Sequence, residues 1–366
     1  MVRDDAGSEK AGHNGLMTAA LLFASAVMTS ATLTPRTELA GPRSPLVARL
    51  SGVDGACKLV LLDTDAKELG RAGASPGDVD LAALFPMIAT QTGVLRVQAV
   101  VGGSPDGAPL LIVPLRNRET IRTTSDLRPD GKTSYTRVIG WGDVLLDPHN
   151  EAHAKLKADW PKPDPQPPSG FRLMSDEDVV FETTAGRIRF VMRADFAPNT
   201  ARNFVELAEK GFYDGTIVHR IVPADRNGLP FVIQGGDPTG TGDGGPGYDL
   251  ALEPSKLAHD FGVLSMARND WPDSAGSQWF VCLSREATAR LDGQYCAFGY
   301  AVDGAEAILA MAEGEVADAA TGRPKSPHTV LRAFTVPAPA WIPGTGRPDR
   351  RVERPAAKVA PVESDR

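Results

Sequence analysis

The sequence predicts a mainly β protein with a barrel-like C-terminal half and a smaller β-rich domain before it. The 37 glycines and 30 prolines among 366 residues favour turn-rich β architecture over helical bundles. Short apolar runs separated by turn signals recur along the chain, and in the C-terminal half only two segments read as helices. Because many strands with two helices do not fit a regular βαβ alternation, we expect a closed barrel with helices over its ends.

Composition and charge exclude several classes of protein. Hydrophobic residues make up 42% of the chain, which is enough for packed cores and too much for a wholly disordered protein. The formal net charge of −7, without a basic excess, argues against a nucleic-acid-binding protein. The three cysteines rule out a disulfide-stapled scaffold and show none of the CxxC spacing typical of metal sites.

We predict a signal-like or disordered N-terminus at 1–43, which contains one long apolar stretch. Residues 16–27 read LMTAALLFASAV and end in small residues, which predicts a cleaved signal peptide and export to the periplasm or cell envelope. The preceding residues mix acidic and basic charges, so a surface helix, a start at Met17 and an uncleaved anchor remain alternatives. Without export the protein would be cytoplasmic. After cleavage we expect no stable membrane span, because no other apolar run approaches the about 20 residues that a span needs.

A proline-rich run predicts the main domain boundary. Residues 161–168 read PKPDPQPP, and so many prolines cannot join a helix or a central strand. We therefore predict a β-rich domain at 44–160, a linker at 161–176 and a barrel domain at 177–336. Residues 337–366 combine prolines and charges with little apolar periodicity, which predicts a disordered tail.

The predicted β-rich domain shows no recognisable chemistry. Its apolar runs predict short strands, and glycines between two of them predict a hairpin near 94–115. His149 and His153 have the spacing of a two-histidine metal site on one helix face. No third ligand is evident nearby, so we expect an exposed histidine pair on a short helix and no metal.

The pattern is sharper in the predicted barrel domain. Alternating residues around a central glycine predict a hairpin over 179–193. Apolar residues at helical spacing follow Pro198, and Gly211 comes after them. This pattern predicts a first helix that begins at Pro198 and is capped at its C-terminus by Gly211. A second helix fits 304–312, with Asp303 placed to cap it.

Common catalytic and nucleotide-binding motifs do not fit this domain. The sequence contains no GxSxG, no HExxH and no P-loop. Gly240, Gly242 and Gly245 match GxGxxG by letter, but Pro246 and Gly247 stand where a dinucleotide-binding helix would begin. We therefore expect a glycine-rich surface loop that positions neighbouring strands.

Six short motifs then follow one another in an order that identifies a family. They are HRIVP at 219–223, FVIQGGD at 231–237, LSMAR at 264–268, GSQWF at 276–280, LDG at 291–293 and FG at 298–299. Residues 177–336 thus closely resemble the cyclophilin family of peptidyl-prolyl cis-trans isomerases, particularly bacterial-style members with a GDPTGTG loop. The resemblance implies an eight-stranded closed antiparallel barrel capped by two helices, and an isomerase that needs no cofactor.

The chemistry of this family requires an apolar slot and a fixed donor. Rotation about a peptide bond faces a barrier of about 18–20 kcal/mol, because resonance ties the nitrogen lone pair to the carbonyl. Each ~1.36 kcal/mol of preferential stabilisation of the twisted state speeds exchange tenfold. An arginine suits this role because it stays protonated and presents several donors in a rigid fork.

The resemblance assigns roles to individual residues. It implies that Arg220 is the catalytic donor and that Gln234 orients it and contacts the substrate backbone. The implied proline pocket consists of Phe231, Phe280 and Leu291. The implied groove for the preceding residues is lined by Ala267, Arg268 and Gln278, with Tyr295 where the family often has a histidine.

Three departures from the family pattern bear on binding. Residues Ala224–Pro230 form an insertion at the rim of the implied groove, and Val232 replaces a methionine common in the pocket wall. Arg290 replaces a tryptophan that is tied in the family to cyclosporin binding. Because Arg220 is retained, we expect turnover on proline-containing polypeptides but weak cyclosporin binding.

Other side chains of this domain are expected to be structural. Trp271 is either a groove-rim contact or a packing residue, and we expect packing. Cys282 and Cys296 are expected to be buried free thiols, although a bond between them stays open if the chain is exported.

The sequence supports a main hypothesis and two alternatives. The main hypothesis is an active foldase that isomerises X-Pro bonds in unfolded or loop segments. The insertion and the large preceding domain motivate the alternative of a proline-peptide-binding or scaffold module with little turnover. A third possibility is that the domain at 44–160 supplies the partner and the barrel is its tethered catalyst.

Overall fold

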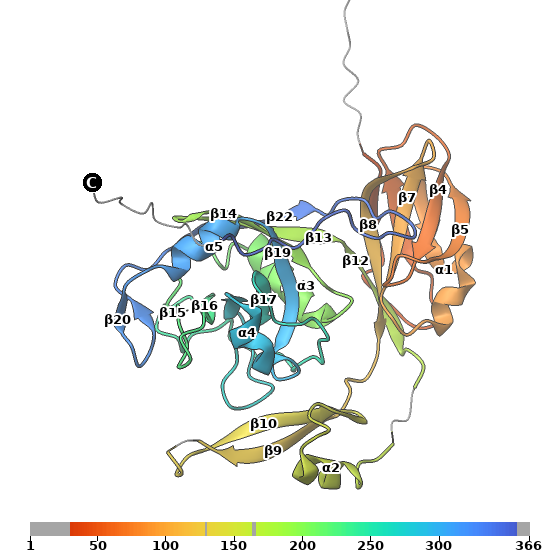
Figure 1. Ribbon diagram of the computed structural model, residues 1–366. Coiled ribbons are helices and arrows are strands. Elements are labelled where there is room, and N and C mark those ends of the chain that lie inside the picture. The colour runs from red at the N-terminus through yellow and green to blue at the C-terminus, as the bar shows by residue number, and fades with distance from the viewer. Residues whose placement is uncertain (1–29, 129, 163–165, 357–366) are drawn as a thin grey trace, which may run out of the picture.

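The computed structural model describes residues 30–128, 130–162 and 166–356. Figure 1 shows an N-terminal β body, a larger β body that contains α3 and α5, and a separate hairpin with a short helix beneath the larger body. The predicted signal-like stretch at 16–27 lies outside the described residues. No helix in the described ranges has the length and hydrophobicity to span a bilayer.

Two facing sheets form the N-terminal body. One sheet has three strands in the order β1-β3-β6, and the other has six strands in the order β2-β12-β8-β7-β4-β5. The strands are β1 (Thr32–Pro35), β2 (Leu39–Ala40), β3 (Val47–Ser51), β4 (Cys57–Leu62), β5 (Glu68–Ala74), β6 (Gly77–Asp80), β7 (Leu95–Val101), β8 (Ser104–Leu115) and β12 (Gly170–Ser175). A short helix α1 (Leu81–Leu84) and a 3-10 turn (Pro86–Thr90) follow β6. Alternating apolar residues such as Leu33, Leu50, Leu59 and Ile112 share one buried core.

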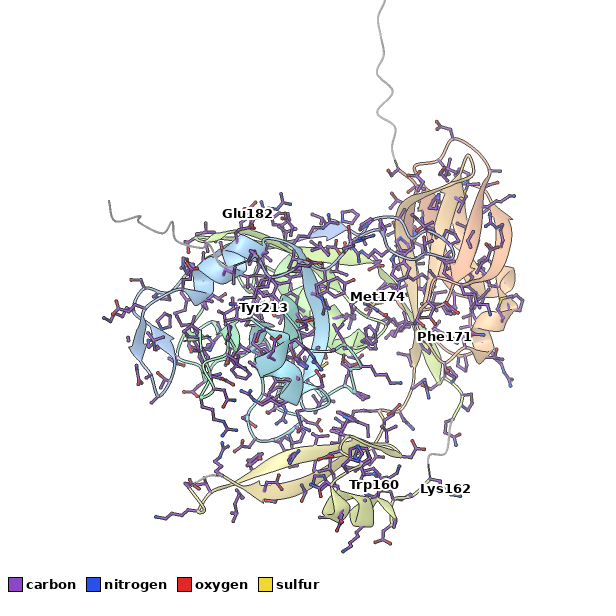
Figure 2. All side chains as sticks on the ribbon, in the orientation of Figure 1. Trp160, Lys162, Phe171, Met174, Glu182 and Tyr213 are labelled. Atoms are coloured by element: carbon purple, nitrogen blue, oxygen red, sulfur yellow. The ribbon has the colours of Figure 1, made fainter. Side chains whose placement is uncertain are left out.

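The predicted boundaries of this domain, 44–160, are wrong at both ends. β1 and β2 precede residue 44, and β12 lies inside the predicted linker at 161–176. β12 pairs with β8 along its whole length and buries Phe171 and Leu173 in the N-terminal core. Figure 2 shows Phe171 and Met174 where β12 leads from this body toward the larger one. The apolar alternation of this six-residue strand outweighs the proline run before it.

The larger body is an eight-stranded antiparallel sheet in the order β15-β16-β18-β17-β19-β14-β13-β22. Its strands are β13 (Glu177–Thr183), β14 (Gly186–Met192), β15 (Arg220–Val222), β16 (Val232–Gly235), β17 (Val263–Met266), β18 (Trp279–Cys282), β19 (Cys296–Asp303) and β22 (Val330–Pro337). A two-stranded ribbon, β20 (Val316–Asp318) with β21 (Arg323–Pro324), lies beside it. The strand number and the hairpin β13–β14 agree with the prediction.

The prediction of a closed barrel is wrong, because the strand ladder is open between β15 and β22. Among the residues that the structure describes, these edges are connected by the isolated bridge between Ile217 and Thr329 and by backbone hydrogen bonds such as Val218 N to His328 O at 2.8 Å. β15 has only three residues, so it ends before a regular ladder to β22 is made. The sheet is therefore a half-barrel joined at one seam by irregular backbone.

Two main helices pack on this sheet, with a short helix α4 (Arg285–Thr288) and a 3-10 turn (Ala289–Leu291) at one end. α3 (Pro198–Glu209) begins at the predicted proline, and Gly211 beyond it has φ +68°. α5 (Ala305–Ala312) is not capped by Asp303 as predicted. Its N-cap is Gly304 at φ +91°, a left-handed conformation that glycine adopts without strain, and the Asp303 carboxylate accepts from the Gly304 N–H.

The hairpin unit is inserted in sequence between β8 and β12, two strands of the N-terminal body. It comprises β9 (Ile121–Leu127), β10 (Ser134–Trp141), β11 (Val144–Leu145) and α2 (Glu151–Lys157). Trp160, labelled in Figure 2, packs against Gly140, where a Cβ would lie 2.4 Å from its ring. The predicted exposed histidine pair on one helix is wrong, because His149 precedes the N-cap Asn150 and His153 is buried. In the described part of the chain, no group of three or more metal-ligating side chains occurs.

The predicted disordered tail is wrong for residues 338–356; residues 357–366 lie outside the described part. Trp341 is buried, and its backbone N–H donates to the Gln98 side chain at 2.7 Å. Arg347 pairs with the buried Asp178. This segment therefore joins the two bodies, and its few apolar residues are held by long-range contacts that local periodicity does not reveal.

Glu177 at the start of β13 is expected to make stability depend on pH. Burial raises the pKa of Glu177 from 4.5 to about 7, and the Glu209 carboxylate adds to this. Between pH 4.5 and 7 the folded state holds this proton more tightly than the unfolded state, so stability falls as pH rises through that window. Urea unfolding measures the free energy of unfolding at pH 4.5 and at pH 7.5. Between these pH values we expect it to fall by about 1–2 kcal/mol more in the unchanged protein than in Glu177→Gln, a figure that allows for the partial exposure of Glu177. Identical pH dependence of the two proteins would contradict this.

Candidate functional site

A chain of hydrogen bonds links three predicted site residues. Arg220 on β15 pairs in register with Gln234 on β16, which pairs with Phe280 on β18. Cross-strand partners lie on the same face of a sheet, so these three side chains share one face. The Arg220 Nη1 donates to Gln234 Oε1 at 3.2 Å, and Gln234 Nε2 donates to Gln278 Oε1 at 2.9 Å. Gln234 thus orients the Arg220 guanidinium, and Gln278 in turn fixes the Gln234 amide.

The Arg220 guanidinium is half-buried and forms no ion pair with any residue that the structure describes. Burial lowers the pKa of Arg220, but an arginine stays protonated in proteins. A positive charge in a partly desolvated setting interacts strongly with any lone pair brought to it. The site therefore presents an un-neutralised, oriented donor.

An apolar cluster lies on the same side of the sheet, separate from the main core. Phe280 and Leu291 are buried in it, and Phe231 and Tyr295 pack against it half-buried. The rings of Phe280 and Tyr295 meet edge to face with centroids 5.6 Å apart. The structure thus brings together all of the residues predicted for the proline pocket.

A buried hydrogen-bond network beneath Phe280 was missed by the sequence analysis. The His259 ring stacks on Phe280 at 6.0 Å and connects the Asp292 carboxylate with the Ser265 hydroxyl, each at 2.9 Å. Burial lowers the pKa of His259, which keeps the ring neutral. Burial opposes ionisation of Asp292, yet hydrogen bonds from His259 and Arg285 hold the pKa of that carboxyl well below its usual range. The network fixes the floor of the pocket.

The predicted groove residues line one cavity of about 550 Å³. Ala267, Arg268 and Gln278 line it together with Gln234 and residues 242–249. The Gln278 amide donates to the carbonyls of Gly242 and Gly244 at 2.8 and 2.9 Å. The glycine-rich loop is therefore a wall of the groove, which agrees with the expectation of a surface loop that positions its neighbours.

The glycine-rich loop is held by one carboxylate. Asp237 accepts from the backbone N–H groups of Thr239 at 2.7 Å and Gly242 at 2.6 Å. Burial raises the pKa of Asp237, but these bonds prevail and lower it to about 2. At neutral pH the carboxylate therefore stays ionised and keeps the groove wall in shape.

The insertion Ala224–Pro230 folds at the rim of the apolar cluster that is predicted to be the proline pocket. The Asp225 carboxylate accepts from backbone groups within the insertion and from Arg290 at 3.1 Å. The Arg290 guanidinium lies 4.2 Å from the centroid of the Phe231 ring. The insertion thus places a cation over one wall of the pocket, a contact that the sequence alone did not predict.

Two further expectations concern Trp271 and the cysteines. Trp271 is 65% exposed, so the prediction that it packs is wrong. Cys282 and Cys296 are buried free thiols, as predicted, and burial raises the pKa of both. The Cys296 thiol donates to the Thr200 hydroxyl at 3.3 Å. These thiols are un-ionised packing groups.

Comparisons with known proteins agree with this arrangement. A family model described as cyclophilin type peptidyl-prolyl cis-trans isomerase/CLD matches residues 178–335. A peptidyl-prolyl cis-trans isomerase-like 1 of Aspergillus fumigatus is 38% identical over 164 residues, which cover 43% of this chain and 95% of the relative. Peptidyl-prolyl cis-trans isomerase B of Bacillus subtilis is 40% identical over 150 residues, covering 40% of this chain and 93% of the relative.

A solved structure is also similar. It is a cyclophilin type peptidyl-prolyl cis-trans isomerase of Cryptosporidium parvum, crystallised in the presence of the dipeptide Ala-Pro. Its identity is 31% and its TM-score 0.39, with 43% of this chain and 98% of that chain covered. The family match confirms the resemblance seen in the motifs, and it leaves the N-terminal body and the hairpin unit outside. Because a fungal and a bacterial protein are about equally similar to this chain, the relatives do not single out the bacterial-style members.

Proposed function

We propose that this chain, which belongs to the cyclophilin family of peptidyl-prolyl cis-trans isomerases, is a foldase that accelerates isomerisation of X-Pro bonds in unfolded or loop segments of other proteins. The observation that carries the proposal is the un-neutralised Arg220 guanidinium, oriented by Gln234 at 3.2 Å on the face that holds the apolar cluster. The family membership supplies the reaction, and this geometry supports its retention in the present chain.

The proposed mechanism needs no covalent step. The proline ring enters the cluster of Phe231, Phe280 and Leu291, which leaves its amide beside Arg220. As the bond twists, resonance is lost and the lone pair returns to the proline nitrogen, where the guanidinium N–H donates to it. The twisted amide is stabilised more than either planar isomer, so the barrier falls in both directions. Gln234 acts as a positioning residue and hydrogen-bonds the substrate backbone.

The groove supports a polypeptide substrate. The cavity beside Ala267 and Gln278 lies next to the Arg220–Gln234 pair and has room for the residues before the proline. Its lining combines backbone groups with few charged side chains, which suits an extended chain of varied sequence. Proline-containing polypeptides are therefore the substrates that we propose.

A proline-peptide-binding or scaffold module with little turnover is the alternative. Arg290 over Phe231 and its contact with Asp225 favour it, because both narrow access to the pocket. A protease-coupled assay of the full chain on a short Ala-Pro-containing peptide separates the two. The proposal expects cis-to-trans conversion well above the uncatalysed rate at substoichiometric enzyme. If the chain binds the peptide but does not accelerate its cis-to-trans conversion, only the binding or scaffold module remains.

Arg290 also leads to an expectation for cyclosporin. An apolar ligand over Phe231 must displace or desolvate the Arg290 guanidinium, which costs affinity. We expect Arg290→Trp, which supplies apolar area and an indole donor, to bind cyclosporin at least about tenfold more tightly than the unchanged chain. Titration calorimetry checks this, and equal affinities would contradict it. Arg290→Ala is expected to lie between the two.

A further inference from the structure

We propose that the β9–β10 hairpin and the loop Asn269–Ser274 form a second binding surface, the client arm, for an extended segment of the client polypeptide outside its X-Pro bond. This inference rests on the proposed function, since it concerns the same polypeptide substrate. The hairpin of the client arm lies outside the family match.

Two ion pairs attach the ends of β9 to one short loop. Arg118, before β9, pairs with Asp273 through both carboxylate oxygens, and Arg128, after β9, pairs with Asp270 at 2.6 Å. If fully extended, residues 118–128 cover about 33 Å, of which β9 itself covers about 23 Å, whereas the four residues 270–273 cover at most about 14 Å. The two arginines therefore converge on the loop, and β9 crosses over it between these points.

The base of the hairpin is fixed to the other side of the isomerase site. The Gln294 side chain donates to Val138 O at 2.6 Å and accepts from Val138 N at 3.1 Å, while Trp141 donates to Gly293 O at 3.2 Å. The backbone of Gln294 in turn accepts from Arg268 of the groove at 3.1 Å. Because these contacts are at least partly buried, the hairpin is held rigidly beside the groove.

A cavity of about 370 Å³ lies between the hairpin and the loop. Ile121, Thr123 and Thr136 line it from the hairpin, and Trp271 and Pro272 line it from the loop. Its volume is within the range of pockets that bind small ligands or side chains. The cavity is thus lined by apolar and hydroxyl-bearing side chains, together with the paired Arg118 and Asp273 and with Glu119.

The cavity continues the groove that we assign to the substrate. Asn269 and Ser274, at the two ends of the same loop, line the groove cavity, whereas Trp271 and Pro272 line the second one. One loop therefore separates two binding surfaces, and a chain leaving the groove over it reaches the hairpin directly. This continuity is the main argument for the client polypeptide as the occupant.

The loop holds Trp271 outward before any ligand arrives. Asn269 Oδ1 accepts from Trp271 N at 2.7 Å, and the Ser274 hydroxyl donates to Trp271 O at 2.6 Å. An indole that is 65% exposed on a turn held in this way contributes contact area at little ordering cost. Exposed aromatic residues of this kind are typical anchors of protein interfaces.

The chemistry of the surface favours an unfolded polypeptide. Arg118 and Arg128 are already paired with carboxylates, so they leave little positive charge for a polyanion. Among the described residues, β9 is an edge strand whose second edge pairs with no other strand. Such an edge can hydrogen-bond an extended chain whatever its sequence, while Trp271 takes an apolar or aromatic side chain.

The test compares a long client with a short one, using the full-length protein. Trp271→Ala and Thr123→Glu are expected to lower kcat/KM for proline-limited refolding of an unfolded protein about fivefold to tenfold, through KM. Both are expected to leave kcat/KM for a tetrapeptide unchanged within twofold, because a tetrapeptide does not extend beyond the groove. Thr124→Glu is the matched control, since the next residue of a strand points to the opposite face. Circular dichroism of each variant confirms its fold.

A second measurement does not depend on turnover. Binding of a permanently unfolded, proline-containing polypeptide, followed by fluorescence anisotropy, is expected to weaken about fivefold in Trp271→Ala and to stay unchanged in Thr124→Glu. Equal affinities of Trp271→Ala and the unchanged chain would overturn the client arm. An equal loss of kcat/KM on the tetrapeptide and on the long client in Trp271→Ala would also overturn it. The loop would then act only by supporting the groove. An inactive but client-binding protein would instead contradict the proposed function alone.

Discussion

Replacing Arg220 with alanine is expected to lower kcat/KM for prolyl isomerisation about 100- to 1000-fold, the usual cost of removing one pre-oriented donor from a developing charge. The fold is expected to remain, because Arg220 is half-buried and its only side-chain hydrogen bond is to Gln234 among the described residues. The loss is expected in kcat more than in KM, since the apolar pocket still holds the proline ring. A protease-coupled assay measures both parameters.

Two variants serve as controls for Arg220→Ala. Arg220→Lys keeps the charge but loses the planar fork, so we expect activity between that of Arg220→Ala and that of the unchanged chain. Arg226→Ala removes an exposed arginine of the insertion and is expected to change activity less than twofold. An Arg220→Ala protein that is folded and as fast as the unchanged chain would remove the donor from the mechanism.

Arg96→Ala is expected to lower the free energy of unfolding by about 3–5 kcal/mol, the typical cost of removing one partner from a buried charge cluster. Arg96 on β7 is only 1% exposed and lies 3.4 Å from Asp195 and 3.7 Å from Asp176. Its guanidinium also stacks over the Trp341 ring at 3.8 Å. Burial raises the pKa of Asp176 even with Arg96 in place, so the loss of this cation leaves an unfavourable buried carboxyl group.

Urea denaturation checks the expectation for Arg96. Arg71→Ala on β5 of the same sheet is the matched control, because Arg71 forms an exposed pair with Glu68 and its loss is expected to change the free energy of unfolding far less than the loss of Arg96. Faster proteolysis after Pro337 is expected in Arg96→Ala, since Trp341 loses its stacking partner. A change below about 1 kcal/mol for Arg96→Ala would show that the cluster does not join the two bodies energetically.

Local patterns predicted the larger body well. The alternation in β13 and β14 and the stripe between Pro198 and Gly211 depend on neighbours in sequence, so the residues reveal them directly. The closure of the barrel depends on how β15 meets β22, which are about a hundred residues apart. Periodicity cannot show that three residues of β15 are too few to complete that ladder.

Long-range contacts account for the errors at β12 and after Pro337. β12 is a strand because β8 is its partner, and the segment after Pro337 is ordered because Trp341 meets Gln98 and Arg96. Neither partner can be identified from spacing, since each lies more than 50 residues away. Proline content was therefore a poor guide in both segments.

The candidate site divides in the same way. Arg220, Gln234 and the pocket residues were found through motifs, and the register of β15, β16 and β18 then places them on one face. The contact of Gln294 with Val138 spans 156 residues, and no pattern in the sequence signals it. The parts outside the family's motifs are those that only the structure could supply.

Exchange spectroscopy by NMR on an Ala-Pro peptide with the full-length chain is the most direct test of prolyl isomerisation at Arg220. Unaided exchange takes tens to hundreds of seconds, too slow to give cross peaks between the cis and trans forms. With catalytic amounts of the chain, we predict such cross peaks, together with peptide-induced shifts at the Arg220 and Gln234 side chains. Peptide-induced shifts at these side chains without any cis–trans cross peaks would contradict the account.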